Sequence, residues 1–176
     1  MQNEYNYVAL VISSGILSMA FAFWKASWIN KQKEGNERMK IIGASIADGA
    51  MAFLRAEYRI LGIFVVVVAF VLGFANSGRA DSSAFIALSF IIGAAASGFA
   101  GFLGMKVATK ANNRTTHAAE KSLAKALNVA FNGGAVMGLS VVGLGVLGLG
   151  ILFYVYGRMG IFNNDISIIL NVLSGF

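Results

Sequence analysis

Four long apolar stretches without any charged residue constrain this chain more than any motif does. They cover residues 5–24, 60–78, 82–105 and 126–157. A helix needs about 20 apolar residues to cross a hydrocarbon core of roughly 30 Å, and each stretch meets or approaches that length. The last stretch is longer than a crossing requires, so we expect it to tilt or to extend beyond the bilayer. The sequence therefore predicts an all-α membrane protein with four transmembrane helices at these positions.

A fifth apolar segment, residues 166–176, is too short to cross a membrane. As a helix it would reach only about 16 Å. We therefore interpret it as the start of a fifth helix. Because a self-contained four-helix protein is expected to end in a polar tail, this ending favours a piece of a longer chain.

The charged residues are few, and their positions predict an orientation. Charged residues make up 12% of the chain, against about 25% in soluble domains. Lysines and arginines number none before the first stretch, seven in residues 25–59, one before the third stretch, five in residues 106–125 and one after the fourth. Lysine and arginine concentrate in cytoplasmic connections. The pattern predicts an integral membrane protein with its N-terminus outside and both basic connectors in the cytoplasm. We expect the membrane to be a prokaryotic cytoplasmic membrane.

The same pattern accounts for the net charge of +6 without a nucleic-acid partner. Basic patches of membrane proteins usually face anionic lipids, so membrane lipids are the expected partners. Cysteine is absent, which excludes a disulfide framework and a thiolate metal site within these residues.

The first basic connector contains an amphipathic pattern. From residue 35 to residue 61, apolar side chains such as Met39, Ile42 and Ile46 recur at three- and four-residue steps, and Lys40 lies on another face. This period is typical of an amphipathic helix, and Asn36 is a suitable N-cap. We expect a cytoplasmic helix that lies on the membrane or runs on into the second transmembrane helix.

Small residues recur at helical spacing in the third and fourth stretches. In lipid, small side chains allow the close backbone approach that holds helices together. The predicted helix-packing residues are Gly93, Ser97, Gly101, Gly134, Gly138 and Gly145.

The second basic connector, residues 106–125, poses the main functional question. Lys106, Lys110 and Arg114 could contact a phosphate group or an anionic lipid, but cytoplasmic connectors carry such residues in any case. The only histidine, His117, has no second histidine, cysteine or acid pair at helical spacing, so we expect a solvated or locally hydrogen-bonded loop residue and no metal centre. The polar residues around it are interpreted as cap and turn residues of a helix that resumes at Ala118; they are Asn112, Asn113, Thr115 and Thr116.

No catalytic set is recognisable. None of the eight acidic residues lies within an apolar stretch. Ion movement through a bilayer normally uses an ionisable group at membrane depth, so these four helices alone are a poor candidate for an ion path. No catalytic, cofactor-binding or metal-binding residue is predicted.

Three blocks of sequence occur in a familiar order: "GNERMKIIGASIADGAMAFLRAEYRIL" from Gly35, "GMKVATKANNRTTHAA" from Gly104, and "ALNVAFNGGAVMGLSVVGLGVLGLG" from Ala126. Together they resemble the N-terminal part of the membrane-integral pyrophosphatases, which couple pyrophosphate hydrolysis to the export of H⁺ or Na⁺. Asp48 departs from the glutamate more usual in that family but retains a carboxylate.

The resemblance implies a homodimeric pump with inner and outer rings of helices, Mg²⁺-complexed pyrophosphate as substrate, and K⁺ as a requirement of some members. It implies that the first four helices belong to the outer ring, and that the remaining helices of the same pump carry the hydrolytic centre and the ion gate. On this basis the chain is an outer-ring scaffold without catalytic residues. The alternative is a self-contained four-helix membrane protein that is structural or binds a partner. The choice between H⁺ and Na⁺ and the need for K⁺ depend on residues outside this sequence.

Overall fold

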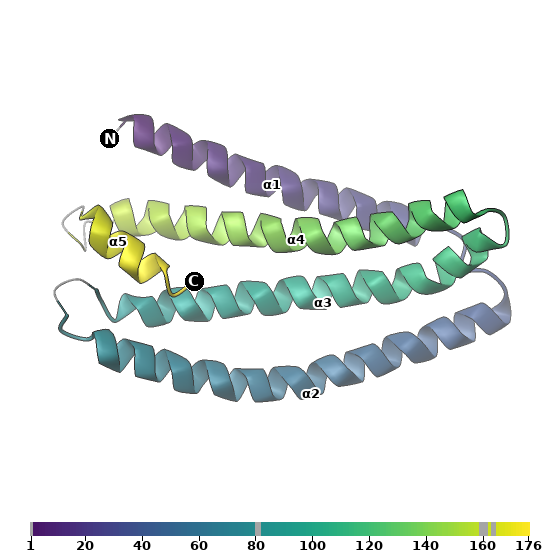
Figure 1. Ribbon diagram of the computed structural model, residues 1–176, viewed down its shortest axis with the longest axis horizontal. Helices are drawn as coiled ribbons and strands as arrows, with labels where there is room; N and C mark the ends of the chain where they lie inside the picture. Colours follow the sequence, from purple (N-terminus) through teal and green to yellow (C-terminus); the bar gives the residue numbers. More distant parts are fainter. Residues whose placement is uncertain (1, 80–81, 159–161, 163–164) are drawn as a thin grey trace. The chain divides into compact units, whose positions relative to one another are not determined.

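The structure is a computed structural model that describes residues 2–79, 82–158, 162 and 165–176, with side chains described from residue 7 onward. The described residues form helices and no strands (Figure 1). The helices are α1 (Gln2–Asn30), α2 (Glu37–Asn76), α3 (Phe85–Ala119), α4 (Leu123–Arg158) and α5 (Ile166–Leu173). Four of them, α1 to α4, are long and apolar enough to cross a membrane. The predicted all-α membrane fold is confirmed.

The predicted amphipathic helix and the second apolar stretch form one continuous helix, α2, of 40 residues. Its start is capped as expected, because the Asn36 side-chain oxygen accepts a hydrogen bond from the Met39 backbone amide at 2.9 Å. Glu37 in the first turn pairs with Lys40 at 3.2 Å, where a negative charge suits the helix dipole. Of the two arrangements left open by the sequence, the helix therefore runs on into the second span.

The expected break in the helix around residues 112–118 is wrong, because α3 continues to Ala119. Instead of capping a new helix, Thr116 donates its hydroxyl hydrogen bond to the carbonyl of Asn112 one turn earlier, at 3.0 Å. A hydroxyl satisfied in this way is compatible with a helix interior. The next helix begins at Leu123, and Ser122 caps it by accepting from the Lys125 amide at 3.3 Å. Polarity in this segment indicates contact with water and not a loss of helix.

The chain divides into two compact units, and each long helix contributes to both. Unit 1 comprises residues 1–16, 59–98 and 143–176, and unit 2 comprises residues 17–58 and 99–142. Unit 1 has a core in which Leu152 and Tyr156 of α4 meet Ile169 and Val172 of α5. Tyr156 also shares a hydrogen bond of 3.0 Å with the fully buried Ser89 of α3. The polar groups of this core therefore satisfy each other.

The short apolar segment after residue 165 forms α5, as predicted. Asp165 caps it, accepting hydrogen bonds from the amides of Ser167 at 2.9 Å and Ile168 at 3.4 Å. The helix has 8 residues, a length of about 12 Å. It packs on the core of unit 1 through Ile169, Val172 and Leu173.

Unit 2 has a core of smaller side chains, with Ala22 and Ile29 from α1, Ala111 from α3 and Val136 from α4. Small residues let the helix backbones come close, as helix pairs in lipid require. In the same unit Ser18 donates a hydrogen bond to the Leu139 carbonyl at 2.9 Å, which links α1 to α4.

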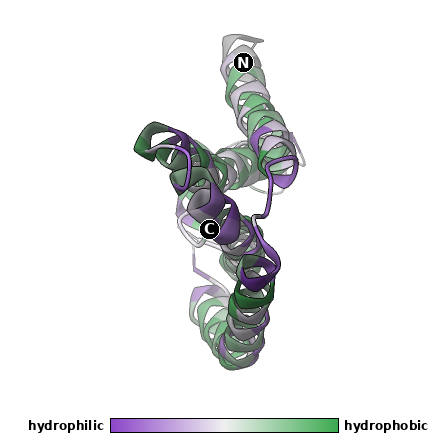
Figure 2. Ribbon diagram, turned by 90° about the vertical axis from the view of Figure 1, so that its right-hand side faces the viewer, coloured by the Kyte–Doolittle hydropathy of each residue, from purple (hydrophilic) through white to green (hydrophobic). Residues whose placement is uncertain are grey.

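Many large apolar side chains of the helices are exposed, and hydrophobic residues, in green, occur along the helices in Figure 2. On α2, Phe70 and Phe74 are 75% and 78% exposed. In water, exposed apolar area costs about 25 cal/mol per Å², whereas hydrocarbon solvates it without such a cost. The outer surface of these helices therefore identifies an integral membrane protein.

Candidate functional site

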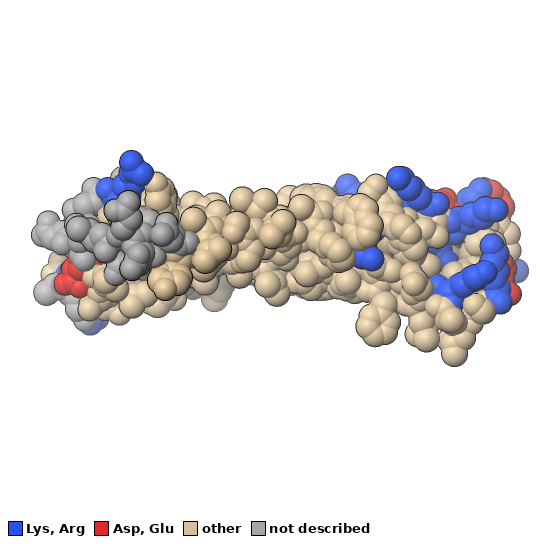
Figure 3. Space-filling model, turned by 90° about the horizontal axis from the view of Figure 1, so that it is seen from above, with Lys and Arg blue, Asp and Glu red and all other residues tan. Residues whose placement is uncertain are grey.

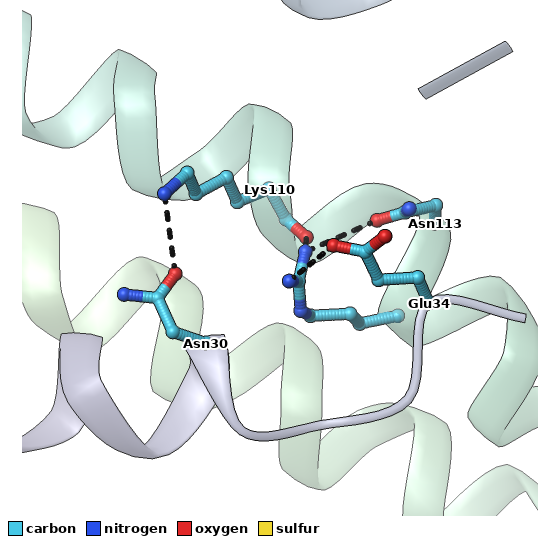
Figure 4. A network of polar contacts seen from close by, with 5 residues as sticks. Asn30, Glu34, Lys110 and Asn113 are labelled. Carbon is cyan, nitrogen blue, oxygen red and sulfur yellow. Dashed lines mark hydrogen bonds and ion pairs between the residues drawn. The ribbon is translucent and has the colours of Figure 1, made fainter. Parts of the chain in front are cut away.

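The most specific polar contact among the described residues surrounds Arg114, near the end of α3. Its side chain is buried, and its Nη2 donates to the Glu34 carboxylate at 2.6 Å. Its Nη1 donates to the Lys110 carbonyl at 2.7 Å and to the Asn113 side-chain oxygen at 3.5 Å. Glu34 lies in the connection between α1 and α2, so one guanidinium attaches that connection to α3 (Figure 4).

Two weaker contacts reinforce the same region of unit 2. Lys110 Nζ donates to the Asn30 side-chain oxygen at 3.4 Å, which joins α3 to the end of α1. A methyl group at Gly43 of α2 would lie 3.2 Å from Asn113, so α2 approaches α3 closely there. Polar groups thus hold the connection and the end of α1 to α3, and α2 packs closely beside them.

The structure separates the three basic residues that the sequence grouped together. Lys106 and Lys110 are exposed, and the Lys106 ammonium lies 5.5 Å from the centroid of the Phe102 ring. Arg114 is 6% exposed and is paired with Glu34. Sequence reasoning missed Glu34, because its partner lies 80 positions away; the one available signal was an acid within a strongly basic connector.

His117 lies in the last turn of α3 and not in a loop. Its Nδ1 is 2.8 Å from the carboxylate of Glu120, so the expected local hydrogen bond is confirmed. Among the residues that the structure describes, no three His, Cys, Asp or Glu side chains gather as metal ligands.

The predicted packing residues have different neighbours in the structure. On α3 in unit 1, Gly93 faces the backbone of Phe176 so closely that any added methyl group would overlap it, while Ser97 is exposed. In unit 2, a methyl group at Gly101 would lie 3.1 Å from the Tyr58 hydroxyl. At the three predicted glycines of α4, an added methyl group would meet nothing within 4 Å among the described residues; they are Gly134, Gly138 and Gly145. Their packing role stays a prediction about neighbours beyond those residues.

Other glycines make the close approaches of α4 that the four-residue spacing did not reveal. A methyl group at Gly133 would lie 3.1 Å from the Ala111 side chain, and one at Gly150 would lie 2.9 Å from Ile12. On α3, Gly104 approaches Met137 in the same way, at 2.6 Å. Spacing indicates that a glycine face exists, but the rotation of the helix about its axis decides which glycines meet a neighbour.

Comparison with known proteins assigns the chain to a family. A family model described as inorganic H⁺ pyrophosphatase matches residues 16–176. The chain belongs to this family. The membership agrees with the resemblance carried by the three sequence blocks.

Relatives in the inorganic H⁺ pyrophosphatase family include pumps for both ions. A protein of Clostridium tetani, named as a K⁺-stimulated pyrophosphate-energized sodium pump, is 49% identical over 152 residues, 86% of this chain and 22% of that protein. The K⁺-insensitive pyrophosphate-energized proton pump of Methanosarcina mazei is 39% identical over 144 residues, 82% of this chain and 21% of that protein. The chain thus spans about a fifth of the length of these relatives.

Proposed function

We propose that this chain is the N-terminal, outer-ring scaffold of a pyrophosphate-energized pump that exports H⁺ or Na⁺. The observation that carries the proposal is the match of most of this chain to about a fifth of proteins named as such pumps. The function is to support and anchor the helices that hydrolyse pyrophosphate and move the ion.

The polar groups of the described residues support a scaffold role. Arg114 and Glu34 neutralise each other, and His117 is paired with Glu120. Both pairs lie at or beside the end of α3, whereas a translocation path needs ionisable groups at membrane depth. Mg²⁺-complexed pyrophosphate, and K⁺ where it is needed, would therefore bind to residues outside this chain. The remaining helices of the same pump and a second subunit are the proposed partners.

The end of α1 supports the proposed orientation. Lys25 Nζ lies 4.8 Å from the ring centroid of Trp24 and 5.3 Å from that of Phe21. Tryptophan and lysine side by side are typical of a membrane–water interface. Both interfaces carry such residues, so the side follows from the charges: Lys31, Lys33 and Lys40 come next, and the positive-inside rule makes that segment cytoplasmic and the N-terminus outside.

Pyrophosphate hydrolysis tests the proposal. The complete open reading frame that contains this sequence, and residues 1–176 alone, are expressed in the same host membranes. We expect hydrolysis and ion uptake by vesicles that hold the complete product, and none by vesicles that hold residues 1–176. Accumulation of Na⁺ in the vesicles identifies a Na⁺ pump, and acidification of the vesicle interior identifies an H⁺ pump. Hydrolysis by residues 1–176 alone would refute the scaffold role.

A self-contained structural or partner-binding protein is the second candidate. The observation that favours this candidate is the set of large exposed apolar side chains on α2, which form a surface that another membrane protein can contact in place of lipid. This second candidate predicts that the complete reading frame encodes a membrane protein that does not hydrolyse pyrophosphate.

A further inference from the structure

A basic cavity lies in unit 2, where α1 and α3 end and α4 begins. It has a volume of about 630 Å³, within the range of small-molecule sites. Its lining includes Trp28, Val129 and five residues with a permanent positive charge, which are Lys31, Lys33, Arg114, Lys121 and Lys125. No aspartate or glutamate is among its lining residues.

Acidic side chains do not balance four of these charges. Lys31, Lys33, Lys121 and Lys125 form no side-chain ion pair or hydrogen bond with any residue the structure describes, whereas Arg114 is paired with Glu34. Lys31 and Lys33 come from the α1–α2 connection, Lys121 from the turn between α3 and α4, and Lys125 from the first turn of α4. In the space-filling view, blue side chains gather at this end of unit 2 (Figure 3). Like charges brought together by separate segments repel one another, and a bound anion relieves that repulsion.

A buried donor in the cavity wall gives a second, independent indication. The Nε of Arg114 is buried without a hydrogen-bond partner among the described residues, although both terminal nitrogens of the same guanidinium are used. Arg114 is only 6% exposed. Buried donors are normally satisfied, and an orphan donor in a cavity wall indicates a missing acceptor. Phosphate oxygens are the acceptors that guanidinium groups bind best.

The other wall of the cavity is apolar. Trp28 is half-buried and Val129 is 4% exposed. Tryptophan is enriched at the level of lipid headgroups, and basic pockets between transmembrane helices bind anionic headgroups. A positive-inside distribution alone would scatter lysines over the connections, and it would not require an apolar wall or an orphan arginine donor beside them.

We propose that this cavity is a binding site for a phosphate group, held by Lys31, Lys33, Lys121 and Lys125 with Arg114 in its wall. The same chemistry is offered by the headgroup of an anionic phospholipid and by free phosphate. The site does not depend on pyrophosphate hydrolysis, so its test is independent of the test of the proposed function.

Native mass spectrometry of the complete protein, purified in detergent, tests the site. Phosphatidylglycerol is added with phosphatidylcholine as the uncharged comparison. The cavity variant is Lys121→Gln with Lys125→Gln, and the matched control is Arg55→Gln with Arg59→Gln, which removes the same charge from exposed positions of α2 outside the cavity. We expect phosphatidylglycerol to bind about 30-fold more weakly to the cavity variant, which corresponds to about 1 kcal/mol for each lysine. The control should change by less than about threefold, since distant charges act only through a screened field.

Inorganic phosphate alone, added to the same detergent-purified protein, separates the two sources. Binding of phosphatidylglycerol that millimolar phosphate does not displace identifies a lipid headgroup. Phosphate binding that is lost in the cavity variant identifies a site for free phosphate. Lys121→Arg with Lys125→Arg should retain either ligand, because it keeps both positive charges. Equal losses in the cavity variant and in the control, or no binding of either probe by the unaltered protein, would overturn the proposal.

Discussion

The guanidinium of Arg114 and the carboxylate of Glu34 lie 2.6 Å apart, although 80 positions separate the two residues in the sequence. Arg114 is nearly inaccessible, with 7% of its side chain exposed, while 44% of the Glu34 side chain is exposed. The pair attaches the connection before α2 to the end of α3, and it neutralises a charge that α3 would otherwise bury alone.

Removing the charge of Glu34 is expected to destabilise the protein. Glu34→Gln leaves the buried guanidinium without a counter-charge, and we expect a loss of about 1–3 kcal/mol in the free energy of unfolding. The control is Glu37→Gln, which breaks the exposed pair with Lys40 and should cost about 1 kcal/mol at most. Thermal unfolding in detergent, followed by circular dichroism, measures both. Equal effects would show that Arg114 does not depend on Glu34.

Gly35 is expected to resist substitution. Its φ is +90°, and an added methyl group would overlap the Met39 sulfur and lie 3.2 Å from His117. The left-handed conformation costs an L-residue about 1–2 kcal/mol, so Gly35→Ala should lower stability by at least that amount. Gly49→Ala, in an open part of α2, should instead be neutral or stabilise by up to about 1 kcal/mol. Thermal unfolding in detergent measures both variants. A Gly35→Ala variant as stable as the unaltered protein would contradict the left-handed conformation at Gly35.

The open glycines of α4 are expected to matter only in the complete protein. A methyl group at Gly134 or Gly138 would meet nothing within 4 Å among the described residues, and the tested variant is Gly134→Leu with Gly138→Leu. If helices of the same pump pack on this face, the bulky side chains should cost about 1–3 kcal/mol by overpacking. Size-exclusion chromatography and thermal unfolding of the complete protein detect the loss, with Gly62→Leu on α2 as the control. Unchanged assembly would assign the Gly134 face to lipid.

The orientation of the chain can be tested with introduced cysteines, since residues 1–176 contain none. Arg38→Cys near the start of α2 and Ser77→Cys just after its end are both at exposed positions. In intact cells, a membrane-impermeant maleimide should label Cys at position 77 at least tenfold more than Cys at position 38. Lysis should equalise the two. Labelling at position 38 in intact cells would reverse the proposed topology.

The sequence by itself determined the membrane-spanning helices, the capped start of α2 at Asn36 and the apolar start of a fifth helix. Hydrocarbon solvation acts on each residue in turn along the chain, so an uncharged stretch of sufficient length identifies a span without any knowledge of its neighbours. The resemblance to the pyrophosphatase family rested on the same kind of contiguous signal, as three blocks of sequence in order.

The tertiary structure alone decided the rest. The residues from Lys106 to Ala119 include many polar side chains, some exposed and some buried like Arg114, and that polarity hid the continuation of α3 from sequence reasoning. The pairing of Arg114 with Glu34, and the contacts of Gly133 and Gly150 where Gly134 was expected, depend on how each helix is rotated about its axis and on which segments fold back beside it. Those are distances through space between remote residues, which a pattern along the chain does not contain.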